Sequence, residues 1–238
     1  MFLSELLYPI HPQKFREEIL GKKYHYWRAP VGASNRYDSL YSWQHFEDLL
    51  NNWRNANHVQ MAAMSPEGKP KTGHKWDKVR DGKLTKADVY NYWRHGHSIV
   101  IPFCEYQTQT LWTICNTFER QMPFGQGVAN MYCSSRQNAK TFEPHKDTTE
   151  NFLFHIDGQV QWSFYKKTDD GQNLKKTDEI TLSSGDLLYI PIGLWHSTKP
   201  LGPRLTASVH FQPKPEKLNR EKMYDWYRWF EYQREIKI

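Results

Sequence analysis

Short apolar segments separated by turn-forming residues dominate the chain between residues 98 and 212. Segments rich in β-branched and aromatic residues are typical of strands, and the Asp157-Gly158 pair between two of them predicts a tight hairpin turn. Helices do not alternate with these strands, so the pattern favours an antiparallel barrel or sandwich over a parallel sheet. The predicted strands are Ser98–Phe103, Val128–Ser134, Thr141–Asp147, Asn151–Ile156, Val160–Lys166, Glu179–Leu182, Asp186–Pro191 and Thr206–Phe211.

Helical periodicity surrounds this β region and enters it once. Apolar residues three and four positions apart predict helices over Pro12–Leu20, Ser42–Leu50, Gln109–Met122 and Glu216–Ile238, with a short helix near 85–94. The apolar stripe of the last helix would pack on the barrel or form a homodimer seam. We therefore expect an N-terminal helical and irregular region packing on the barrel (1–97), a β barrel (98–212) and a C-terminal helix (213–238).

The stretch from Ser65 to His97 holds eight Lys and Arg against four Asp and Glu, with Gly and Pro scattered through it. Its composition predicts a basic loop ahead of the short helix. The loop could be a solvated surface or a lid that faces the substrate. His95 and His97 lack an acidic neighbour, so we expect both to be exposed or hydrogen-bonded.

Composition limits the class of protein. The 238 residues carry a formal charge of +6, which permits an acidic partner such as RNA without requiring one. The three cysteines show neither CxxC spacing nor an even count, which argues against a disulfide framework and a structural zinc site. The first residues lack a basic region followed by a long apolar run, and no stretch of the sequence reads as a membrane span. These features predict a soluble cytoplasmic protein.

His145 and Asp147 are two residues apart in a predicted strand, so both side chains would point to one side and reach one metal ion. His196 follows another predicted strand and would complete the set. Two imidazoles and one carboxylate form the facial triad of non-haem Fe(II) oxygenases, which leaves coordination positions open. Glu150, three residues after Asp147, is expected to face away.

Several segments resemble the JmjC/cupin hydroxylases, in particular those of the ribosomal-oxygenase type, over roughly residues 90–212. They are Ala129-Asn130-Met131-Tyr132, His145-x-Asp147, the segment Phe154–Trp162, and Gly185-Asp186-Leu187-Leu188-Tyr189-Ile190-Pro191-x-Gly193-x-Trp195-His196. The resemblance implies a double-stranded β-helix that binds Fe(II) through His145, Asp147 and His196. It also implies 2-oxoglutarate as co-substrate, hydroxylation as the reaction, and succinate as a product.

One position departs from the family. Its members usually place Lys or Arg two residues after the glycine of the hairpin to bind the far carboxylate of 2-oxoglutarate, and Val160 stands there. Arg204, with Thr206 on the same segment, is the first candidate to replace that cation, and Lys140 and Tyr132 are further candidates. Asn151 is expected near the metal-chelating end of the co-substrate, or else satisfying backbone groups.

Other functions stay open at this point. Because Val160 replaces the expected cation, the chain could be a non-catalytic module that binds nucleic acid or protein through its basic region. It could also be a metal cupin with chemistry that does not use 2-oxoglutarate. The family resemblance makes a protein or peptide the expected substrate, with RNA as an alternative, and no feature predicts binding to a membrane.

Overall fold

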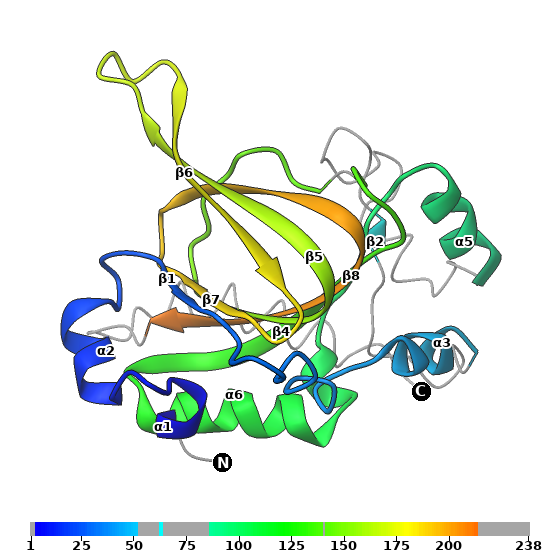
Figure 1. The fold of residues 1–238 in the computed structure, drawn as a ribbon, viewed down its shortest axis with the longest axis horizontal. Helices are drawn as coiled ribbons and strands as arrows, with labels where there is room; N and C mark the ends of the chain where they lie inside the picture. The colour runs from blue at the N-terminus through cyan, green and yellow to red at the C-terminus, as the bar shows by residue number, and fades with distance from the viewer. Residues whose placement is uncertain (1–2, 52–61, 64–85, 140, 214–238) are drawn as a thin grey trace, which may run out of the picture.

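The structure, a computed structural model, describes residues 3–51, 62–63, 86–139 and 141–213 (Figure 1). One large antiparallel sheet curls into a barrel, with helices on its lower side and at one end. In chain order the elements are α1 Leu3–Leu6, α2 Pro12–Glu18, β1 His25–Trp27, α3 Trp43–Asn51, β2 Ala62–Ala63, α5 Lys86–Arg94, β3 Ile99–Ile101, the 3-10 helix Cys104–Tyr106, α6 Gln109–Gln121, β4 Phe124–Ser134, β5 Glu150–Lys167, β6 Leu174–Ser183, β7 Leu187–Ile190 and β8 Trp195–Pro213.

The strands pair in the order β1-β7-β5-β8-β4-β3-β2, and β6 pairs with β5 outside this path. Every pairing is antiparallel, which confirms the mainly β antiparallel architecture predicted from the sequence. The two longest strands, β5 and β8, pair along almost their whole length and bend together. Their shared bend brings residues from both ends of the pair around one interior.

Helices close one side of the barrel with apolar side chains. In α6 the residues Leu111, Ile114 and Phe118 are buried, as expected for an amphipathic helix. The Thr108 hydroxyl caps its start by accepting from the Leu111 N–H. Phe118 packs against Phe152 of β5 with ring centroids 4.3 Å apart. The predicted helices that became α2, α3, α5 and α6 are thus confirmed, with small differences at their ends.

The predicted hairpin at Asp157-Gly158 is wrong. β5 runs unbroken from Glu150 to Lys167, and the pair forms a β-bulge against β8. Gly158 has φ +80°, and a Cβ atom there would lie 1.9 Å from the Pro203 carbonyl oxygen. The glycine therefore serves a close approach of two backbones where the strand pair bends, rather than a reversal of the chain.

The predicted strand Thr141–Asp147 is also wrong. This segment is irregular apart from an isolated bridge between His145 and His196. Pro144 lacks an N–H and so cannot donate to a ladder at the residue before His145. β8, by contrast, begins eleven residues before the predicted start at Thr206, so His196 lies inside the strand rather than between strands.

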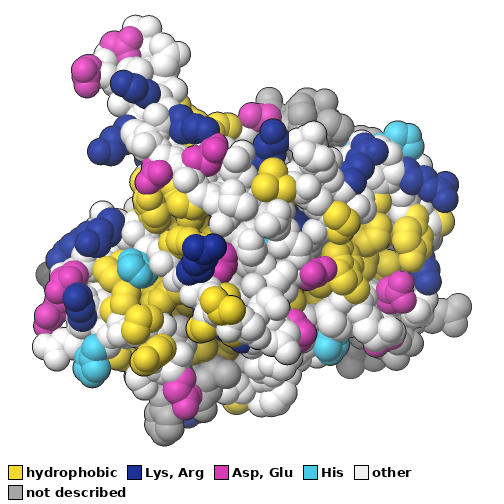
Figure 2. Space-filling model, in the orientation of Figure 1, with side chains coloured by type: hydrophobic (Ala, Val, Ile, Leu, Met, Phe, Trp, Pro, Cys, Tyr) yellow, Lys and Arg dark blue, Asp and Glu magenta, His cyan; other side chains and the backbone are white. Residues whose placement is uncertain are grey.

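The ends of β5 and β6 form a hairpin that projects from the barrel. Its surface carries charged side chains of both signs (Figure 2), among them Lys166, Lys175 and Asp170. The basic loop predicted before residue 86 and the helix predicted over 213–238 fall, apart from residue 213, outside the described residues. Among the described helices, none has the length and apolar character needed to cross a membrane.

Candidate metal centre and its cavity

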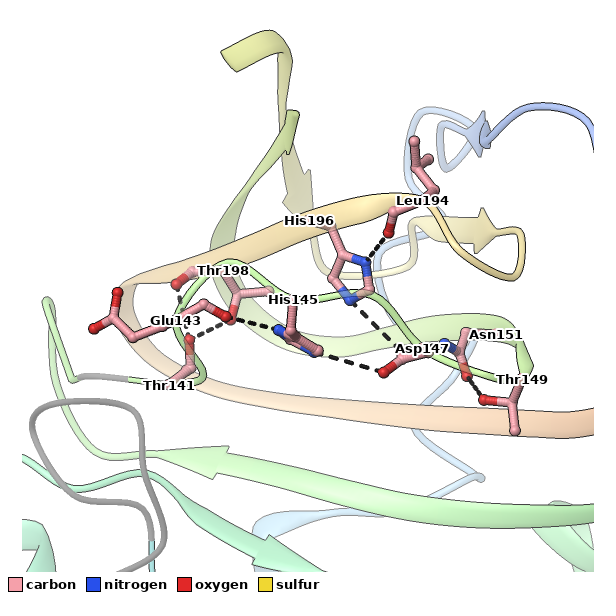
Figure 3. Close-up of polar contacts among 9 residues, drawn as sticks. All are labelled: Thr141, Glu143, His145, Asp147, Thr149, Asn151, Leu194, His196 and Thr198. Carbon is pink, nitrogen blue, oxygen red and sulfur yellow. Dashed lines mark hydrogen bonds and ion pairs between the residues drawn. The ribbon is translucent and has the colours of Figure 1, made fainter. Parts of the chain in front are cut away.

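Backbone hydrogen bonds hold three polar side chains at the open end of the barrel. The His145 N–H donates to the His196 carbonyl at 3.0 Å, and the His196 N–H donates back at 2.8 Å. The Gly193 N–H donates to the Asp147 carbonyl at 3.0 Å. The structure thus brings His145, Asp147 and His196 together although the first two lie in no strand (Figure 3).

The spacing of these side chains suits one small cation. His145 Nε2 lies 3.6 Å from Asp147 Oδ1, and His196 Nε2 lies 3.5 Å from Asp147 Oδ2. The three possible ligand atoms lie within 4.8 Å of one another. Within the described ranges, no other group of His, Cys, Asp and Glu side chains is arranged in this way.

Hydrogen bonds to backbone carbonyls select the tautomer of each neutral imidazole that suits a metal. The ring nitrogen Nδ1 of His145 lies 2.8 Å from the Glu143 carbonyl, and that of His196 lies 2.9 Å from the Leu194 carbonyl. A carbonyl oxygen only accepts, so Nδ1 carries the hydrogen and Nε2 keeps its lone pair in each neutral ring. Burial lowers the pKa of His196 below its ordinary value, which favours the neutral ring. Both lone pairs are therefore available for a cation beside Asp147.

A cavity of about 200 Å³ opens beside the three residues. In the β5–β8 ladder His196 pairs with Phe164, Thr198 with Trp162, and Arg204 with Gly158. The cavity therefore extends along β8 from the metal-binding group to Arg204 at the bend. Its remaining lining residues are Tyr132, Thr141, Phe142, Asn151, Leu153, Ile190, Thr206 and Ser208.

Arg204 gives one end of the cavity a positive charge. Its side chain is 2% exposed, and its Nε donates to Ser134 Oγ at 3.1 Å. The guanidinium carbon lies 6.0 Å from the Tyr132 ring centroid. No carboxylate pairs with it among the residues that the structure describes, and burial lowers its pKa to about 10. A buried cation without a counter-ion, next to a cavity, fits an anionic ligand.

Thr206 lies two residues further along β8, and its hydroxyl contacts His155. His155 Nε2 lies 3.0 Å from the Gly158 carbonyl and Nδ1 lies 2.9 Å from Thr206 Oγ1. Burial lowers the pKa of His155 to about 4, so the ring is neutral at pH 7 and its one hydrogen is on Nε2. Nδ1 must then accept from Thr206. Toward the cavity, the Thr206 hydroxyl oxygen can therefore only accept hydrogen bonds.

The other predicted residues fall in different places. Tyr132 and Asn151 line the cavity, and burial raises the pKa of Tyr132 to about 12. The Asn151 amide donates to Asp147, so this side chain does more than satisfy backbone groups. Glu150 accepts from the Tyr189 hydroxyl instead of joining the metal-binding group, and Lys140 lies outside the described residues.

Seven lining residues escaped the sequence argument: Thr141, Phe142, Leu153, Trp162, Ile190, Thr198 and Ser208. Val160 and Trp162 belong to the same buried apolar cluster, and of the two only Trp162 lines the cavity. Alternation along the predicted strand from Val160 would have placed Trp162 on the same side as Val160. His95 agrees with expectation, since its Nδ1 lies 2.7 Å from the Asn91 carbonyl. His97 is buried.

Comparison with known proteins places this geometry in context. Residues 102–218 match the family model described as JmjC domain. The bifunctional lysine-specific demethylase and histidyl-hydroxylase NO66 of Dictyostelium discoideum is 24% identical over 235 residues, and the match covers 87% of this chain. The protein of the same name from Branchiostoma floridae is 25% identical over 206 residues, covering 86% of this chain.

A solved structure of YcfD, a ribosomal oxygenase from Escherichia coli in complex with cobalt and 2-oxoglutarate, superposes with a TM-score of 0.61 at 17% identity. It covers 96% of this chain. The likeness confirms the JmjC-like double-stranded β-helix that the sequence predicted. This chain spans 57% of that structure's length, and 41% and 31% of the lengths of the two sequence relatives.

Proposed function

We propose that the chain is a JmjC-domain protein, as the match over residues 102–218 supports, and an Fe(II)- and 2-oxoglutarate-dependent oxygenase that hydroxylates a protein side chain. The observation that supports this most is the arrangement of His145, Asp147 and His196. Two imidazole lone pairs and one carboxylate converge from backbone positions fixed by hydrogen bonds. This donor set suits Fe(II) and leaves coordination positions for other ligands.

The residues have separate roles in this proposal. His145, Asp147 and His196 would hold Fe(II), and Arg204 would bind the far carboxylate of 2-oxoglutarate. Bound together, the metal and co-substrate supply O2 activation, with 2-oxoglutarate converted to succinate and CO2 as the substrate gains a hydroxyl group. Leu153 and Ile190 line the cavity with apolar surface that keeps water from the reacting groups.

Arg204 answers the difficulty raised by Val160. Arg204 of β8 lines the cavity beside the three candidate metal ligands, so it can supply the cation that Val160 does not. A guanidinium can bind a carboxylate through two hydrogen bonds, and its burial strengthens that interaction. The absence of a cation at position 160 is therefore no argument against co-substrate binding.

A protein substrate is the reading that the relatives favour. The Dictyostelium and Branchiostoma relatives are named for histidyl hydroxylation and lysine-specific demethylation, both on protein side chains. RNA as a substrate and a homodimer through the C-terminal helix stay predictions, as does a cytoplasmic location.

Turnover of 2-oxoglutarate tests the proposed activity. The protein loaded with Fe(II) should convert 2-oxoglutarate to succinate, and H145A and D147A should abolish that conversion. Absence of both 2-oxoglutarate binding and succinate would contradict the proposal. Binding of nucleic acid that weakens steeply with salt and ignores metal would instead support the non-catalytic module.

Screening peptides identifies the substrate. Incubation with peptides that contain histidine, lysine, asparagine or arginine should add one oxygen atom to one residue type, read by mass spectrometry. The same mass increase on an RNA base, without any on the peptides, would reject a protein substrate.

A further inference from the structure

The indole N–H of Trp162 is a buried donor without an acceptor. Trp162 lies on β5 with 6% of its surface exposed, and Nε1 has no hydrogen-bond partner among the described residues. Buried polar groups are nearly always hydrogen-bonded, so an exception beside a cavity points to a partner inside the cavity.

Two other indoles donate a hydrogen bond, as is usual for a buried N–H. Trp27 Nε1 donates to the Leu7 carbonyl at 3.0 Å, and Trp43 Nε1 donates to Asp157 at 2.7 Å. Trp93 also has an unpartnered buried N–H, but its ring packs on Phe46 and does not line the cavity. Trp162 combines an unsatisfied donor with a place in the cavity wall.

The position of Trp162 says what kind of acceptor it would meet. Its ring centroid lies 5.6 Å from that of His196, and it pairs with Thr198, between His196 and Arg204 along β8. Trp162, His196 and Arg204 all line the one cavity, so an anion held between the candidate metal ligands and Arg204 would lie beside this indole. Asp147 is the one carboxylate in the described lining and is already engaged by Asn151, and Nε1 meets no acceptor on any described residue, so its acceptor would come from a molecule in the cavity.

We propose that Trp162 Nε1 donates a hydrogen bond to a carboxylate oxygen of the bound co-substrate. This inference rests on the proposed function and adds a second donor to it. Val160 leaves β5 without a cation for the anion, and the same strand supplies a neutral donor two residues later. In this arrangement Arg204 supplies the positive charge that attracts the anion, and Trp162 supplies a directional hydrogen bond to it.

The substitution W162F tests this role because it keeps an aromatic ring and removes the donor. The matched control is W93F, which removes an equally unpartnered indole away from the cavity. Calorimetry on the Zn(II)-loaded protein measures the Kd of 2-oxoglutarate, and near-UV circular dichroism checks that both variants are folded. We expect W162F to weaken binding about tenfold and W93F to change it less than about twofold.

Nuclear magnetic resonance gives a readout that does not depend on activity. The indole ¹⁵N–¹H signal that is missing from the W162F spectrum identifies Trp162. On addition of 2-oxoglutarate to the Zn(II)-loaded wild type this signal should move to lower field, as a new hydrogen bond to a carboxylate requires. The Trp93 signal, assigned from W93F, should stay in place.

The outcomes separate this inference from the proposed function. If the wild type binds 2-oxoglutarate but the Trp162 signal stays still and W162F binds equally well, the role of Trp162 is wrong and the oxygenase proposal stands. If the Zn(II)-loaded wild type fails to bind 2-oxoglutarate, and the Fe(II)-loaded protein forms no succinate, both are wrong.

Discussion

The Asn151 amide nitrogen lies 2.5 Å from Oδ2 of Asp147, the carboxylate oxygen that faces His196 (Figure 3). The amide donates to this oxygen and so fixes the orientation of the carboxylate. The Thr149 hydroxyl in turn donates to the Asn151 carbonyl oxygen at 3.1 Å. A chain of two hydrogen bonds thus orients one of the three candidate ligands.

Removing the amide should loosen the metal site. Partners that orient a metal ligand typically change metal affinity by about 10–100-fold when they are mutated. We expect N151A to weaken Fe(II) or Mn(II) binding by about tenfold, measured by competition with a chelator. T149V should have a smaller effect because the bond between Asn151 and Asp147 remains. Equal effects of the two variants would contradict the proposed orientation of Asp147.

Arg204 should destabilise the ligand-free protein and strengthen the binding of 2-oxoglutarate. A buried charge without a counter-ion destabilises the folded protein, and an apolar side chain of similar volume relieves this penalty. We expect R204M to raise the Tm of the ligand-free protein by about 2–4 °C. The same variant should weaken 2-oxoglutarate binding by about a hundredfold or more.

The control for this prediction is K140A, since Lys140 was the alternative cation. We expect K140A to change the Kd of 2-oxoglutarate by less than about twofold. Similar losses in R204M and K140A, measured by calorimetry, would remove Arg204 from the proposed role.

Thr206 should contribute to stability rather than to co-substrate affinity. Its hydroxyl hydrogen is committed to His155 Nδ1, so it has no hydrogen to donate to a carboxylate. T206V leaves that nitrogen without a donor, which should lower the free energy of unfolding by about 1–3 kcal/mol in urea denaturation. The Kd of 2-oxoglutarate should stay within about twofold. A tenfold weaker Kd would show that the hydroxyl binds the ligand.

The grouping of His145, Asp147 and His196 was predictable from the sequence because it depends on residue types and motifs and not on the exact backbone. Two imidazoles and a carboxylate point to a metal through their chemistry. This holds for His145, Asp147 and His196 whether or not the first two lie in a strand. The three residues do lie close together, although the strand predicted over Thr141–Asp147 does not form. The single bridge between His145 and His196, rather than a regular strand, aligns the side chains.

Features that depend on register between distant segments were harder to predict. Whether Asp157-Gly158 reverses the chain or bulges it depends on the backbone of Pro203, which approaches from β8. The unsatisfied indole of Trp162 and the shared hydrogen of His155 and Thr206 likewise exist only once β5 and β8 are paired. No local pattern in the sequence carries that information.

Glu105 should make stability depend on pH. Burial raises the pKa of this carboxyl group to about 7, while its ordinary value is 4.5. Between these values the unfolded chain loses the proton and the folded protein keeps it, so stability falls as pH rises from about 4.5 to 7.

E105Q retains an oxygen that can accept from the Ala129 N–H and removes the titration. We expect E105Q to raise Tm by several degrees at pH 8 and to change it little at pH 4.5, in thermal melts at both pH values. A Tm difference that does not vary with pH would contradict this.

Gly158 and Gly171 allow the bulge to be tested against a matched control. Both have positive φ, +80° and +68°, but a Cβ atom at position 158 would clash with the Pro203 carbonyl, whereas position 171 has no atom within 4 Å. G171A should therefore show only the backbone penalty, about 1 kcal/mol in urea denaturation. G158A adds a clash that two paired strands cannot relieve without moving, and we expect a loss of about 3 kcal/mol or more. Because Arg204 follows Pro203 directly, G158A should also weaken 2-oxoglutarate binding, while G171A should not. Equal losses of stability in the two variants would show that β5 does not approach β8 this closely at the bend.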